Sequence, residues 1–116
     1  MTELNINGMI LSKSVIESIV SLAATSVEGV YSVGDPTTSG IRAFLGLAKP
    51  TTGGIEIECG DNNDLSIELH IWVLSGIVLP DLAQSIRLSV ADAINTQIGL
   101  EVESVDIYID GIHFIH

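Results

Sequence analysis

The feature that most constrains the fold is a ten-residue run, Leu65 to Leu74, in which apolar residues occupy every second position. Leu65, Ile67, Leu69, Ile71 and Val73 alternate with Ser66, Glu68, His70 and Trp72. Because successive side chains of a strand point to opposite faces of a sheet, this period predicts a strand with one buried face and one open face.

Other short segments show the same period and predict further strands. Ile55, Ile57 and Cys59 alternate with glutamates, and the turn-forming residues 61–64 connect this segment to the long strand. The two segments therefore predict an antiparallel hairpin.

A short strand is also expected at 29–33. Near the end of the chain, Val105, Ile107 and Ile109 alternate with polar residues, and Asp110-Gly111 then indicates a tight turn before a last strand at 112–115. We expect a second hairpin or a sharp bend there.

Two segments have the helical period instead. Residues 14–28 predict an amphipathic helix that Ser12 or Ser14 caps, with Ser14 and Glu17 in capping-box spacing and Gly29 as the terminating residue. Its expected buried stripe is Val15, Ile16, Ile19, Val20, Ala23 and Val27. A second helix is expected from Pro80 to Gly99, because proline suits the first turn and Asp81 favours the N-terminal end of the helix dipole. Its expected buried stripe is Leu82, Ala83, Ile86, Val90, Ala93, Ile94 and Ile98.

The order of these elements predicts a fold class. A helix, three strands, a helix and two strands favour an α+β two-layer sandwich, with two helices packed on one face of a mostly antiparallel sheet. The 116 residues fit a single domain spanning 1–116. Residues 34–54, rich in Gly, Pro, Thr and Ser, predict a long flexible loop within it.

Charge and composition exclude several classes of function. Fifteen acidic residues against four basic ones give a formal charge of -11, which disfavours nucleic-acid binding and favours a basic or neutral protein partner. No apolar run is long enough to cross a bilayer, and the first residues lack the features of a secretory signal. The single cysteine, Cys59, excludes an internal disulfide and fits a reducing compartment, so we expect a cytoplasmic protein.

The search for chemical motifs gives no catalytic, metal or cofactor site. The three histidines, His70, His113 and His116, lack the spacing that metal sites use. The chain also has no nucleophile motif and no glycine-rich phosphate loop, and its acidic pairs fit a solvated face. We therefore expect no enzyme activity and no cofactor.

The open face of the predicted sheet is the first candidate interaction site. His70, Trp72 and Tyr108 are expected there among carboxylates. Exposed aromatics on a sheet resemble an RNA-binding platform, but the acidic surround argues against nucleic acid and favours a protein partner. The alternative is that Trp72 and Tyr108 are cross-strand neighbours that pack on each other and stabilise the face.

Two further apolar features are candidate contacts. Phe44 and Leu45 lie in the 34–54 loop, near Arg42 and Lys49. This apolar segment is expected to dock on a membrane protein, to self-associate, or to fold back over the core. Leu88 falls among the polar positions of the second helix, where a single exposed apolar residue is commonly without function.

Taken in order, these segments resemble the bacterial alkaline shock protein family over nearly the whole chain. The residues that carry the resemblance are Gly8-Met9-Ile10-Leu11-Ser12, Val15-Ile16, Ile19, Ala23-Ala24, Val27-Glu28-Gly29-Val30, Gly54-Ile55-Glu56-Ile57, Val73-Leu74-Ser75-Gly76, Gly99-Leu100-Glu101-Val102 and the segment from Val105 to Phe114.

The resemblance implies a non-enzymatic protein-interaction module. Members of this family are small cytosolic proteins of the envelope stress response, often self-associating, and some are held at the membrane by an integral partner. The expectation is therefore a scaffold or adaptor in cell-envelope stress homeostasis. The alternative that the resemblance offers is a regulator that binds an enzyme subunit, such as acetyl-CoA carboxylase in fatty-acid synthesis.

Overall fold

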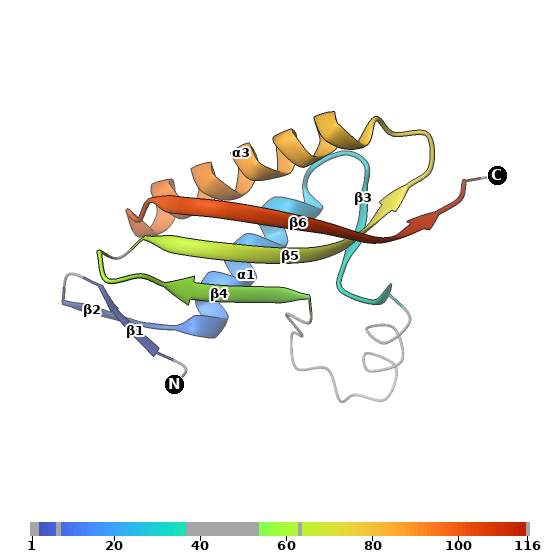
Figure 1. Cartoon of the computed structure of the whole chain (residues 1–116). Coiled ribbons are helices and arrows are strands. Elements are labelled where there is room, and N and C mark those ends of the chain that lie inside the picture. Colours follow the sequence, from blue (N-terminus) through green and yellow to red (C-terminus); the bar gives the residue numbers. More distant parts are fainter. Residues whose placement is uncertain (1–2, 7, 37–53, 63, 116) are drawn as a thin grey trace, which may run out of the picture.

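The computed structural model describes residues 3–6, 8–36, 54–62 and 64–115. Within these residues, two helices lie on one face of a four-stranded sheet, and a two-stranded hairpin precedes them (Figure 1). Apolar side chains from both layers meet in one core. This arrangement confirms the α+β architecture that the sequence predicts.

The central strand of the sheet is β5 (Leu65–Leu74), the alternating segment. β4 (Ile55–Cys59) pairs antiparallel with its first half, from Leu69 to Leu65, and β3 (Val30–Val33) pairs antiparallel with its second half, from Val73 to Ile71. Both therefore lie along one edge of β5. The predicted hairpin of β4 and β5 and the predicted strand at 29–33 are confirmed.

The other edge of β5 is occupied along its whole length by β6 (Val102–His113), which runs parallel to it. The prediction of a hairpin or bend at Asp110-Gly111 was wrong. These residues lie at a bulge, where the register shifts between Ile71 and Trp72, so that Trp72 is opposite Gly111. A strand absorbs one extra residue in this way and keeps its pairing, and the pairing continues until Ser75 N–H donates to His113 C=O at 3.0 Å.

The N-terminal hairpin, β1 (Glu3–Ile6) and β2 (Met9–Ser12), is an element that the sequence interpretation missed. Gly8 has a φ of +82°, a conformation that glycine adopts without strain and that short hairpin turns require. Ile6 is only 1% exposed and belongs to the core. The hairpin thus extends the apolar core beyond the sheet and helices.

α1 (Lys13–Thr25) begins as predicted and ends earlier than predicted. The Ser12 side chain accepts a hydrogen bond from Ser14 N–H at 3.3 Å and caps the N-terminus. At the other end, the Thr25 and Ser26 hydroxyls donate to carbonyls of the preceding turn, and the chain leaves the helix three residues before Glu28. Gly29 has a φ of +108° in the tight turn that follows. Val15 is exposed, not buried as expected.

α3 (Leu79–Ile98) matches its predicted bounds. Pro80 lies in the first turn with Asp81, and Gly99 ends the helix with a φ of +80°. Four residues of the predicted stripe are buried, namely Leu82, Ile86, Val90 and Ile94. The Ser89 hydroxyl donates to Ala23 C=O at 2.9 Å, which ties α3 to α1.

The five inward side chains of β5 are each at most 1% exposed. They form the middle of the core, between β4 or β3 on one side and β6 on the other. Most of the predicted loop, residues 37–53, lies outside the described residues. Of the 34–54 segment, only residues 34–36 and 54 belong to the described residues.

The position of β5 predicts the cost of a cavity within it. Leu69→Ala should lower the free energy of unfolding by about 2–5 kcal/mol, because the surrounding strands and helices cannot collapse onto the space left. Leu88→Ala is the matched control, since Leu88 is 62% exposed on α3, and it should change stability by less than about 0.5 kcal/mol. Urea unfolding followed by far-UV circular dichroism measures both. Equal losses would contradict the placement of β5.

Candidate interaction site

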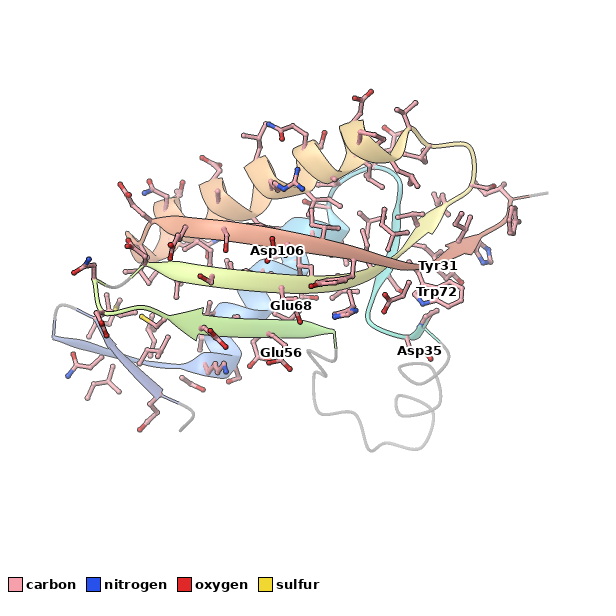
Figure 2. The ribbon with its side chains drawn as sticks, viewed as in Figure 1. Tyr31, Asp35, Glu56, Glu68, Trp72 and Asp106 are labelled. Atoms are coloured by element: carbon pink, nitrogen blue, oxygen red, sulfur yellow. The ribbon has the colours of Figure 1, made fainter. Side chains whose placement is uncertain are left out.

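The outer face of the four-stranded sheet is the candidate site. Both helices pack on the opposite face, so within the described residues no helix covers this one (Figures 1 and 2). The side chains that line it are Glu56 and Glu58 from β4, Ser66, Glu68, His70 and Trp72 from β5, and Asp106 and Tyr108 from β6. Sequence alternation predicted this set of side chains on one face.

One end of this face carries a row of carboxylates. Glu56 is directly opposite Glu68, and Glu68 is directly opposite Asp106, so three acids lie side by side across three strands (Figure 2). With Glu58, Ser66 and Ile67 they line a shallow depression of about 180 Å³. Like charges opposite each other in a sheet repel and destabilise the pairing. Among the described residues, no group of acidic, histidine or cysteine side chains is arranged to hold a metal ion.

His70 and Tyr108 form a stacked pair in the middle of the face. Their rings are 4.6 Å apart between centroids and only 8° from parallel, as expected for residues directly opposite each other on β5 and β6. His70 Nδ1 lies 3.0 Å from Asp110 Oδ2, and its Nε2 lies 3.6 Å from Glu68 Oε2. The imidazole is therefore held between two carboxylates and one aromatic ring.

Trp72 and Tyr108 are not directly opposite each other, as the alternative of cross-strand packing expected, because Tyr108 is opposite His70. The bulge at Asp110 brings Trp72 over Gly111, and a Cβ at that glycine would be 2.6 Å from three atoms of the indole ring. Glycine at 111 is thus the residue that gives the indole its space. Nearby, Tyr31 of β3 stacks on His113 of β6, with ring centroids 4.1 Å apart.

The acidic surround changes the ionisation of the phenol. The Glu68 carboxylate, with smaller effects from burial and from Asp106, raises the pKa of Tyr108 above its ordinary value of 10.0. Tyr108 therefore keeps its proton, and its hydrogen-bond donor, well into the alkaline range.

The other candidate residues lie elsewhere. Leu88 is exposed on α3, in a groove between that helix and β6 and not on the outer face. Phe44 and Leu45 lie outside the described residues. Sequence interpretation missed Tyr31 and His113 as members of the aromatic cluster, because their stacking depends on the unbroken course of β6 past Gly111.

Comparison with known proteins places these features in a family. A model of the alkaline shock protein 23 family, which has a cell envelope-related function, matches residues 2–114. The chain belongs to this family. An uncharacterised protein of Streptococcus pyogenes serotype M6 is 23% identical over 112 residues, which cover 97% of this chain and 84% of the relative. No solved structure matches the chain.

The alkaline shock protein family assignment confirms the resemblance seen in the sequence, and it gives the chain a general envelope-related role. Neither α1 nor α3, the two helices of the described residues, has the length and apolar character that a membrane span requires.

The contact between Gly111 and Trp72 gives a testable prediction. Gly111→Ala should lower the free energy of unfolding by about 1–3 kcal/mol, because the new methyl group overlaps the rigid indole ring. In a Trp72→Leu background the same substitution should cost clearly less. Urea unfolding followed by far-UV circular dichroism measures all four proteins. Strictly additive losses would show that the two residues do not touch.

The ionisation of Tyr108 gives a second testable prediction. In a Tyr31→Phe protein, Tyr108 is the single tyrosine, and its absorbance at about 295 nm should titrate above pH 10 because Glu68 repels the phenolate. Glu68→Gln should lower the midpoint, while Glu58→Gln, on the neighbouring strand, should change it less. A midpoint insensitive to Glu68→Gln would contradict the geometry.

Proposed function

We propose that this protein is a non-enzymatic interaction module, a self-associating scaffold or adaptor in cell-envelope stress homeostasis. It would act in the cytoplasm and reach the membrane through an integral membrane partner. Its partners are proteins, itself included, and not nucleic acids, since the chain carries a net charge of -11.

The observation that carries this proposal is the outer face of the sheet, which neither helix of the described residues covers. The part of this face away from the carboxylate row carries five aromatic side chains, namely Tyr31, His70, Trp72, Tyr108 and His113. Aromatic residues with a polar tip are enriched in protein interfaces, where they combine apolar contact area with a hydrogen bond. The two stacked pairs hold four of these five rings in place before a partner arrives, which reduces the entropy lost on binding. The envelope-related role of the family supports the same interpretation.

The acidic end of the face favours a second candidate, a regulator that binds an enzyme subunit such as acetyl-CoA carboxylase. Glu56, Glu68 and Asp106 repel one another across three strands. A basic patch on a partner would relieve this repulsion and would be attracted over a distance of about 10 Å at moderate ionic strength. Binding by this end of the face should weaken as salt is added.

Light scattering coupled to size exclusion, at low and high salt, tests the proposal. We expect assemblies larger than a monomer that persist at high salt, because apolar and aromatic contacts are little affected by screening. Trp72→Glu should shift the protein toward the monomer, since a carboxylate in the middle of the contact would be desolvated without a partner charge.

The matched control is Leu22→Glu, which places the same charge on α1, where Leu22 is 71% exposed and far from the outer face. It should leave the assembly unchanged. Circular dichroism shows that each variant folds. A monomer at every concentration would rule out the scaffold, and a monomer that captures one partner in a salt-sensitive manner would favour the regulator.

A further inference from the structure

The outer edge of β6 is a second surface, separate from the outer face of the sheet. Among the described residues no strand pairs with this edge, although β6 is 12 residues long. Exposed edges offer unpaired backbone donors and acceptors to other chains, and proteins commonly protect them with lysine or proline. The β6 sequence contains neither residue.

The hydrogen bonds of β6 show which of its residues direct their N–H and C=O groups to the free edge. Val105 C=O accepts a hydrogen bond from Arg87 Nε of α3 at 3.2 Å, so Val105 directs its backbone groups away from β5. Alternate residues of a strand direct these groups to the same edge, so Ile107 and Ile109 do so as well. A carbonyl oxygen accepts two hydrogen bonds, so Arg87 still leaves Val105 able to pair with an added strand.

A groove runs beside the first half of this edge. It lies between α3 and β6, has a volume of about 410 Å³, and is lined by residues that include Arg87, Leu88, Ala91, Val102, Glu103 and Asp106. Leu88 is 62% exposed at its side. Further along, the Ile109 and Ile112 side chains are 36% and 41% exposed. An added strand would cover this apolar surface.

We propose that the β6 edge binds an extended, basic segment of a partner protein, which adds to the sheet as a fifth strand. In this mode of recognition, backbone hydrogen bonds supply affinity and alternate side chains supply specificity. Side chains of the added strand that point toward α3 would contact Leu88, Ala91 and Ile109 and should be small and apolar. Those that point to the outer face of the sheet would lie beside Asp106 and Asp110 and should be lysine or arginine.

Charge selects this occupant over a second copy of the chain. β6 and its preceding residue carry four acids, Glu101, Glu103, Asp106 and Asp110, and each copy has a net charge of -11. Pairing two such edges brings like charges together, whereas a basic segment neutralises them. Arg87 lies on the helix side of the edge and would repel basic side chains there. The basic side chains of the segment are therefore expected on the side of the outer face.

The probe is a fluorescent octapeptide of alternating lysine and valine, with capped ends, measured by anisotropy at fixed salt. Two isomers of this peptide are compared. One carries backbone N-methyl groups on all its valines and the other on all its lysines, so each lacks the N–H donors along one of its two edges. Their composition and charge are the same. Strand addition predicts that their affinities differ by about tenfold or more. If the peptide pairs antiparallel to β6, the valines direct their backbone N–H groups at β6. The valine-methylated isomer should then have the lower affinity.

The protein variants are Leu88→Lys, at the groove, and Leu22→Lys, on α1. Both leucines are largely exposed, and the two substitutions change the total charge identically. Leu88→Lys should weaken binding of the unmethylated peptide about tenfold and Leu22→Lys should not. Equal binding of the two isomers, or equal effects of the two variants, would overturn the proposal in favour of nonspecific attraction. A peptide-free dimer that Leu88→Lys alone dissociates would overturn it in favour of a second copy.

Discussion

β5 is the strand on which every other part of the sheet depends. Its five inward side chains are almost completely buried, and both of its edges are paired. Because one face of β5 is apolar throughout, a shift of register by one residue would expose that entire face to water. The apolar alternation therefore fixes which side chains of β3, β4 and β6 point toward the helices and which point away.

The same constraint creates the outer face. Once the apolar positions of β5 are directed at α1 and α3, Glu68, His70 and Trp72 have to lie on the other side, beside residues of β4 and β6. The sheet thereby brings carboxylates into a repelling row and holds aromatic rings in stacked pairs. Neither arrangement is needed to fill the core.

Much of this could be predicted from local sequence, because periodicity and caps depend on near neighbours. The bounds of α3, the burial of β5 and the β4–β5 hairpin followed from such signals. The parallel course of β6 could not be predicted, since Asp110-Gly111 is compatible with a turn or a bulge and long-range pairing with β5 decides between them. The N-terminal hairpin does have a local signal in the sequence, the dipeptide Asn7-Gly8, which favours two-residue hairpin turns. The stacking of Tyr31 on His113 depends on that same long-range pairing.

Residue-resolved amide hydrogen exchange, measured by NMR on dilute protein, tests most directly that β6 is a parallel edge strand of β5. In the parallel pattern, Asp106 and Tyr108 donate their N–H groups to β5, while Ile107 and Ile109 point outward. The account predicts slow exchange at Asp106 and Tyr108 and fast exchange at Ile107 and Ile109. Equal protection of all four amides would contradict it, because β6 would then be paired on both edges.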